Sequence, residues 1–386
     1  MMTAGWQLPG LRQRTGDQTR RPETFTPEQL EKIAWRREAA AEPFRGVADA
    51  AGVRPGLFPL RTTGADVAGM REAARGYLAR LTPEQREQGR FPMDDVSWRH
   101  WSNGARYFLR HGLLLEELDD GARARALAVI RASLSEAGYR QIVDLMHLNL
   151  TIGELRGEEH LLNEWMYWFS VYGAPESDGP WGWQLDGHHV CVNCVFVGDQ
   201  MVLTPTFLGA EPVVAEAGRY QGTAAFRREE SVARDLYAGL TADQRKLAVL
   251  AEEMPLGLFV GAFRDNFELA YTGLPFGELT AGQRALSHEL LDLYIGRAPD
   301  GHARALRAEA LAHEEETYFS WVGDPDGVFY YRVHSPVILI EFEHQRGVMF
   351  DNDVPLPLHI HTVVRTPNGN DYGVDLLRRH HELYHH

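Results

Sequence analysis

Cysteine is scarce in this chain of 386 residues, which contains only Cys191 and Cys194. The two cysteines are three positions apart in an extended run, where residues at that offset point to opposite faces of a strand. A disulfide between them, or a metal ion shared by both, is therefore not expected. We predict two structural thiols.

Long apolar runs are also missing. Apolar runs such as those at 247–251 and 337–340 are far shorter than the roughly 20 residues that a membrane-spanning helix requires. The N-terminal residues are polar and rich in arginine, without the apolar stretch of a secretory signal. We therefore expect a cytoplasmic protein with no membrane partner.

Positive charge is in deficit, because 39 Lys and Arg stand against 54 Asp and Glu, for a net charge of −15. Nucleic-acid binding uses a basic surface, so we expect no such partner. The sequence also lacks the G-x-S-x-G, H-E-x-x-H and P-loop motifs, and no strand leads into G-x-G-x-x-G. These absences leave serine hydrolases, zincins, kinase-like enzymes and Rossmann enzymes without their usual support.

What is present is typical of a globular protein, with 44% apolar and 24% charged residues. Four helix starts carry a capping box, in which a threonine is followed three positions later by glutamine and preceded by an apolar residue. The four threonines are Thr26, Thr82, Thr241 and Thr280. Their uneven spacing does not indicate a repeat protein.

The hydrophobic pattern divides the chain into helical and strand-rich parts. It predicts helices over 27–50, 64–90, 103–138, 158–171, 227–253, 280–297 and 302–317. It predicts strands over 188–197, 200–205, 327–333, 337–343, 348–350 and 358–365, with a hairpin turn at Gly198 and Asp199.

We therefore predict a disordered segment over 1–24 and a single α+β domain over 25–386, built on an antiparallel sheet. Its large N-terminal helical portion covers 25–175, and a first strand block covers 183–206. A helical insertion at 225–318 precedes the second strand block at 327–366. Both strand blocks are expected to join the same sheet.

The sharpest chemical signal is the pair His359 and His361. On a strand, residues two apart share a face, so both imidazoles can reach one metal ion. A pair of ordinary surface or core histidines is the alternative.

A second pair, His188 and His189, follows Asp186 and Gly187. Adjacent strand residues face opposite ways, so only one of the two histidines is expected to bind the ion, unless Gly187 permits a bulge. An ordinary turn followed by a strand is the alternative. Asp186 is a candidate to orient an imidazole, or to act as a base.

Glu341 ends an apolar run, where a lone carboxylate is costly unless it is paired or metal-bound. As a ligand, it would complete a set of two histidines and one carboxylate, which suits non-haem iron. A set of three histidines suits zinc or copper instead. Pairing with Arg332 or Arg365 is the alternative for Glu341.

The turn-rich loop after the second histidine pair supplies three more candidates. Arg365 is a candidate to bind a substrate carboxylate, and Asp371 and Tyr372 are candidates for proton transfer. A purely structural loop is the alternative. A cluster of aromatic residues at 165–169, with Trp181 and Trp183, is expected to form a core belt.

On these motifs the chain resembles an uncharacterised domain-of-unknown-function family found in bacteria and fungi. The motifs are W-G-W-Q-L-D-G-H-H at 181–189, Asn193, T-P-T-F-L-G-A at 204–210, I-E-F at 340–342, H-I-H-T at 359–362 and N-D-Y-G at 370–373. The resemblance covers most of the chain, from about 25 to 380. It implies that these segments belong to one site, and it supplies no substrate.

The sequence thus predicts a metalloenzyme that uses a divalent transition metal and a small-molecule substrate. The favoured class is an iron or copper oxygenase or oxidase acting on a small organic, carboxylate-bearing molecule. A zinc hydrolase or lyase that activates water is the first alternative. A non-catalytic metal-binding protein is the second, and the oligomeric state is left open.

Overall fold

A computed structural model of the protein describes residues 8–13, 25–105 and 109–384. The described residues form ten α-helices and a sheet of twelve strands, which confirms the predicted α+β class. The helices are α1 (Pro27–Ala41), α2 (Ala68–Arg80), α3 (Pro83–Gly89), α4 (Asp120–Ser133), α5 (Glu136–Arg156), α6 (Arg227–Ala238), α7 (Ala242–Ala248), α8 (Ala281–Ile295), α9 (Asp300–Ala312) and α10 (Val374–Tyr384).

The strands are β1 (Arg90–Phe91), β2 (Leu113–Leu114), β3 (Tyr167–Gly173), β4 (Trp181–Gly187), β5 (Val190–Val197), β6 (Gln200–Val202), β7 (Thr206–Ala210), β8 (Leu274–Pro275), β9 (Tyr318–Gly323), β10 (Phe329–His334), β11 (Leu339–Arg346) and β12 (Pro355–Arg365). Their order is β1-β3-β4-β5-β7-β12-β11-β10-β9-β8, with β2 beside β3 and β6 beside β5. Among the strands of the described residues, only the short β1–β3 pair is parallel.

The two strand blocks do join one sheet, as predicted, through the antiparallel pairing of β7 with β12. Between them the chain forms α6 to α9, the expected helical insertion. The predicted hairpin at Gly198 and Asp199 connects β5 with β6, and Gly198 has a φ of 60°.

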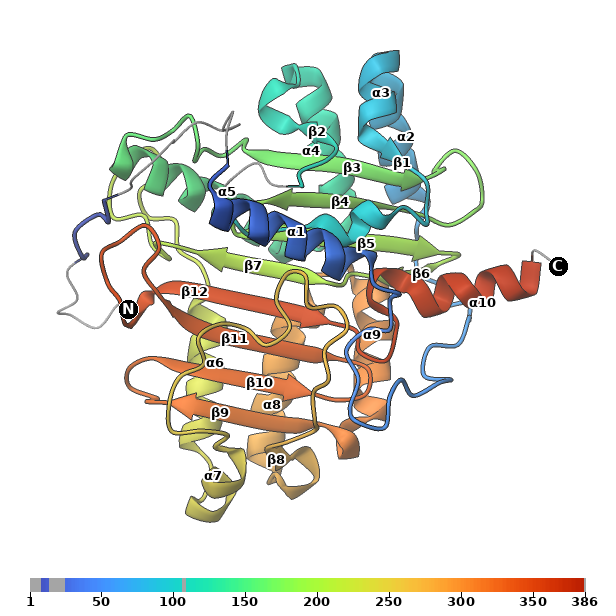
Figure 1. Ribbon diagram of the computed structural model, residues 1–386. Coiled ribbons are helices and arrows are strands. Elements are labelled where there is room, and N and C mark those ends of the chain that lie inside the picture. Colours follow the sequence, from blue (N-terminus) through green and yellow to red (C-terminus); the bar gives the residue numbers. More distant parts are fainter. Residues whose placement is uncertain (1–7, 14–24, 106–108, 385–386) are drawn as a thin grey trace.

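Each face of the sheet is covered by different parts of the chain (Figure 1). Helices α4, α5, α6 and α8 pack on one face around the larger apolar cluster. The opposite face is covered by α1 and by irregular segments that include Phe58, Trp101 and Val260. Cys191 and Cys194 are unpaired and lie in different clusters, one on each face, as their spacing predicted.

The predicted helix over 158–171 is wrong, because β3 begins at Tyr167. Aromatic and β-branched residues favour a strand here, and their side chains pack on both faces of the sheet. Tyr167, Phe169 and Val171 enter the larger cluster, whereas Tyr172 enters the cluster on the other face. Trp181 and Trp183 are fully buried, which confirms the core belt.

Other boundaries also differ from the prediction. The predicted helix over 103–138 contains α4 and the beginning of α5 but also β2, while the predicted strand at 348–350 is only an isolated bridge between Phe350 and Leu11. Most of the predicted disordered segment, 1–24, lies outside the described residues. In the described residues, no helix combines the length and the apolar character needed to cross a membrane.

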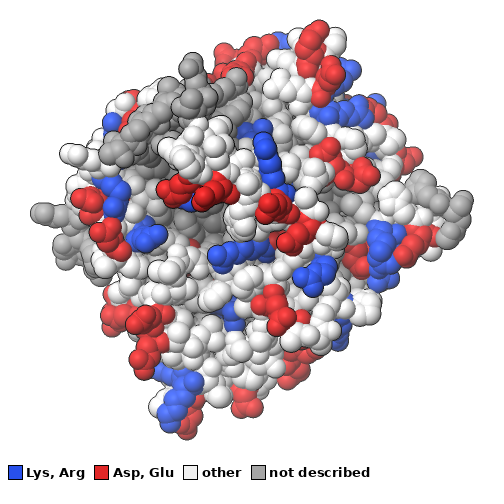
Figure 2. Space-filling model, viewed as in Figure 1, with Lys and Arg blue, Asp and Glu red and all other residues white. Residues whose placement is uncertain are grey.

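Figure 2 shows the face that carries α1, where acidic and basic side chains are interspersed. No broad area of a single sign is visible on this face. Such a surface has no basic stripe of the kind that tracks a nucleic-acid backbone.

All four capping boxes form as predicted, with both reciprocal hydrogen bonds at each helix start. We expect Thr280→Ala to lower the free energy of unfolding by about 1 kcal/mol, because the backbone N–H of Gln283 loses its acceptor. Thr280→Ser keeps the acceptor and should retain most of the stability. Urea denaturation of the two variants is the measurement, and equal stability of Thr280→Ala and wild type would contradict the expectation.

Candidate metal centre

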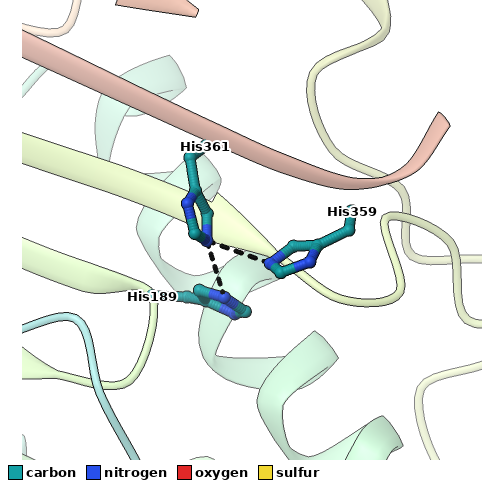
Figure 3. Close-up of side chains that lie close together, drawn as sticks. All are labelled: His189, His359 and His361. Atoms are coloured by element: carbon teal, nitrogen blue, oxygen red, sulfur yellow. Dashed lines mark hydrogen bonds between the residues drawn. The ribbon is translucent and has the colours of Figure 1, made fainter. Parts of the chain in front are cut away.

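Three histidines converge on the sheet face that carries α1. His359 and His361 come from β12 and share a face, as predicted, while His189 comes from the turn between β4 and β5. The Nε2 atom of His361 lies 3.0 Å from Nε2 of His359 and 3.2 Å from Nε2 of His189. Figure 3 shows the three rings pointing toward one another, with dashed lines from His361 to each of the other two. This group can hold a metal ion.

The first histidine pair occupies a turn rather than the predicted strand. Gly187 pairs with Val190, so His188 and His189 form a two-residue hairpin loop. His189 has a φ of 66°, a left-handed conformation that histidine adopts more readily than most side chains. The two rings therefore stack, with centroids 4.0 Å apart, instead of facing opposite ways.

Only His189 belongs to the converging group, in line with the expectation of a single ligand from this pair. His188 Nδ1 lies 2.7 Å from Oδ1 of Asn149 on α5. That amide donates its own N–H to the carbonyl of Asn163, so its oxygen is the acceptor for His188. His188 thus anchors the turn to the helical layer.

Gly209 on β7 provides the space that the three rings need. It pairs directly with His361 across the β7–β12 ladder. A Cβ atom at this position would lie 2.8 Å from Cδ2 of His361 and 3.1 Å from Cδ2 of His189. Both contacts are shorter than side chains normally allow, so any larger residue would push these two rings out of place.

Two carboxylates that were not predicted as site residues stand behind the rings. Nδ1 of His359 lies 2.7 Å from the carbonyl oxygen of Arg346 and 3.6 Å from Glu211. Glu211 itself accepts hydrogen bonds from the backbone N–H groups of residues 348–350. This arrangement fixes the ring of His359 and leaves its Nε2 directed at the other histidines.

Glu343 is the second carboxylate, with Oε1 3.5 Å from Nδ1 of His361. Its Oε1 also accepts from the side-chain amide of Gln345, whereas its buried Oε2 has no hydrogen-bond partner in the described part of the chain. Burial raises the pKa of Glu343 to about 8. The cross-strand pairing of Glu343 with His361 explains its place in the site, and the sequence gives no direct sign of that pairing.

Burial keeps the three rings uncharged. It lowers the pKa of His359 to about 4 and that of His361 to about 3, and it holds the pKa of His189 well below its usual range. Neutral imidazole is the form that binds a metal ion.

Hydrogen bonds cannot account for both short distances among the three Nε2 atoms. A neutral ring offers either one proton or one lone pair at Nε2, so His361 cannot make a linear hydrogen bond to both neighbours. A cation between the rings would accept all three lone pairs. With metal–nitrogen bonds of about 2.1 Å, nitrogens 3.0–3.2 Å apart subtend roughly 90–100° at the ion, which leaves one side open.

Glu341 does not join this group, although it lies on β11 with Glu343. Its carboxylate accepts hydrogen bonds from the backbone N–H groups of Phe259 and Val260 and from the hydroxyl of Tyr330. These three bonds offset the cost of burying a carboxylate at the end of an apolar run. The structure thus shows hydrogen-bond partners for Glu341 where metal ligation or pairing with an arginine was predicted. Burial raises the pKa of Glu341.

Asp186 also has other partners. Its side chain accepts a hydrogen bond from the backbone N–H of Ser102 at 2.9 Å and forms a buried ion pair with Arg110. These two contacts link β4 to the segment that contains Ser102 and Arg110, on the same side of the sheet as α1. The interactions of Asp186 therefore anchor the fold beside the histidine turn.

Arg365, Asp371 and Tyr372 form a buried network at the far end of β12. Arg365 has no exposed side-chain surface and bonds to Asp265 at 2.7 Å and to Asp371 at 3.2 Å. The hydroxyl of Tyr372 donates to Asp265 and accepts from the indole of Trp101. Arg365 is four positions along β12 from His361, which is about 13 Å. The structure thus places this guanidinium in a buried ion-pair network apart from the histidines.

The chain is thus a mixed α+β protein with a buried group of three histidines at the centre of its sheet. Residues 63–374 match the family described as "Protein of unknown function (DUF3500)", and the protein belongs to that family. This finding confirms the resemblance to an uncharacterised family. Comparison with curated proteins gives no match, and comparison with solved structures gives none either.

We expect Gly209→Ala to weaken metal binding at least ten-fold, because its Cβ would displace two of the three rings. Competition with a chromophoric chelator measures the affinity. Gly282→Ala is the matched control, since a Cβ at this exposed helical position meets nothing within 4 Å. Unchanged affinity in Gly209→Ala would show that the rings tolerate the displacement.

Arg365→Met should destabilise the protein by about 3–5 kcal/mol, because the buried Asp371 loses its cation and the buried Asp265 retains only Arg99. At a temperature where the variant is folded, its metal content should equal that of wild type. Thermal unfolding and metal analysis provide the two measurements. Full stability combined with lost substrate turnover would instead support the predicted role of Arg365 in substrate binding.

Proposed function

We propose that the protein is a metalloenzyme in which His189, His359 and His361 hold one zinc ion that activates water. The convergence of three Nε2 atoms on one point is the observation that carries this proposal. Three histidines with an open fourth position form a catalytic type of zinc site. The reaction class is accordingly a hydrolysis or a lyase reaction on a small organic molecule.

The absence of a carboxylate from the converging group favours zinc over iron. Non-haem iron oxygenases use two histidines and one carboxylate, and the expected carboxylate, Glu341, is held by other bonds. Three neutral imidazoles leave the full charge of the ion uncompensated. An ion held in this way would lower the pKa of a water bound to it to about 7.

The residues around the rings have separate tasks in this proposal. The Arg346 carbonyl and Glu211 hold His359, while Glu343 stands behind His361. The side chain of His361 is 12% exposed, so solvent and substrate would approach the ion along this ring. Among the described residues the group offers three ligands rather than four, which favours a catalytic ion over a purely structural one.

Copper-dependent oxygen chemistry is the second candidate, because three imidazoles are also a suitable copper set. The ring of Phe207 lies 5.0 Å from that of His361 and gives the site an apolar wall. This wall favours a reaction from which bulk water is excluded.

Metal analysis of protein purified without a histidine tag tests the proposal. We expect one equivalent of zinc in wild type, at least a ten-fold loss of metal in His361→Ala, and full content in the control His313→Ala. The ring of His313 bonds to Glu316 outside the converging group, so its loss should not affect the ion.

Hydrolysis of p-nitrophenyl acetate supplies the activity readout. Zinc-loaded wild type should exceed chelator-treated protein and His361→Ala at least ten-fold. Stoichiometric copper together with oxygen consumption would instead support the second candidate, copper-dependent oxygen chemistry. Wild type without any bound metal would overturn both.

A further inference from the structure

The protons on the converging histidines are constrained by the groups around the rings. Nε2 of His361 lies 3.0 Å from Nε2 of His359 and 3.2 Å from Nε2 of His189. Binding of one ion by all three rings requires a lone pair at each of these Nε2 atoms. The proton of each neutral ring must then be on Nδ1, where it needs a hydrogen-bond acceptor.

His359 meets this requirement without an ion. Its Nδ1 lies 2.7 Å from the carbonyl oxygen of Arg346, and a carbonyl oxygen can only accept a hydrogen bond. Burial lowers the pKa of His359 to about 4, so the ring is neutral and has a single proton. That proton is therefore on Nδ1, and Nε2 of His359 carries a lone pair.

The short contact between His359 and His361 gives His361 the opposite tautomer when no ion is bound. Two lone pairs that face each other at 3.0 Å repel, so one of the two Nε2 atoms must carry a proton. His359 has no proton at this position, and Nε2 of His361 is therefore the donor. An ion can bind all three rings only after this proton has left Nε2.

Glu343 lies on the other side of the His361 ring. It is the direct cross-strand partner of His361 on β11, and its Oε1 is 3.5 Å from Nδ1 of His361. The side-chain amide of Gln345 donates to the same Oε1 and fixes the orientation of the carboxyl group. Oε1 has a second lone pair for the Nδ1–H of His361, whether the carboxyl group is ionised or carries a proton on Oε2.

We propose that His361 changes tautomer when the ion binds, and that Glu343 is the positioning residue that accepts the Nδ1–H of the metal-bound form. The proton on Nε2 passes to solvent and another is taken up at Nδ1, so the ring stays neutral and no net proton is released. The side chain of His361 is 12% exposed, which gives solvent access for this exchange. The inference rests on the proposed function, because it assumes that the three Nε2 atoms bind one ion.

NMR of the full chain labelled with 15N-histidine tests the change of tautomer, because long-range 1H–15N correlations show which ring nitrogen carries the proton. His361→Gln identifies the signals of His361. We expect its proton on Nε2 in chelator-treated wild type and on Nδ1 after one equivalent of zinc is added. His359 is the internal control and should carry its proton on Nδ1 in both samples. A proton on Nδ1 of His361 before zinc is added would overturn the proposal.

Zinc affinity, measured by competition with a chromophoric chelator, tests the role of Glu343. Glu343→Leu removes the acceptor and should weaken binding at least ten-fold. Glu343→Gln is the matched control, because its amide oxygen can accept at the same place, and it should recover most of the affinity. Equal affinity of Glu343→Leu and wild type would show that solvent accepts the Nδ1 proton, and would overturn the role of Glu343.

The zinc-loaded wild type gives a further measurement that does not depend on the folding of a variant. Slow exchange of the His361 Nδ1 proton with water would support Glu343 as its acceptor, and rapid exchange would contradict it. These experiments use added zinc and no substrate. A tautomer change without hydrolysis of p-nitrophenyl acetate would contradict the proposed function alone, whereas zinc-dependent hydrolysis without a tautomer change would contradict this inference alone.

Discussion

The pairing of β7 with β12 is the contact on which the architecture depends. Five residue pairs join two strand blocks that the chain separates by four helices. The same ladder brings Gly209 beside His361, and β5 on its other side carries the turn with His189. A shift of one residue in this register would turn His359 and His361 to the opposite face of the sheet. The fold and the candidate centre thus share one determinant.

Local patterns predicted the features that depend on neighbouring residues. The four capping boxes, the Gly198 hairpin and the shared face of His359 and His361 all follow from spacings of two to four residues. The aromatic strand at Tyr167 was mistaken for a helix, because a short apolar run has no distinct period. The strand predicted from residue 188 begins two residues later, at Val190, because His188 and His189 form the turn that precedes it.

The roles of the polar residues depend on interaction partners that are distant in sequence. Local sequence patterns do not predict these partners. Glu341 meets the backbone of Phe259 and Val260, and Arg365 meets Asp265, all from a segment without helix or strand. Glu211 and Glu343 reach the histidines only through strand pairing and loop contacts. The sequence therefore identified the histidines by their chemistry but could not distinguish the carboxylates near them from those elsewhere.

The separation of His189 and His361 by 172 residues has a consequence for the order of events in folding. Closing so long a loop costs conformational entropy before any ligand contact can form. A metal ion held by these histidines would therefore depend on strand pairing across the whole sheet, whereas the ligands of a small zinc finger are close together in sequence.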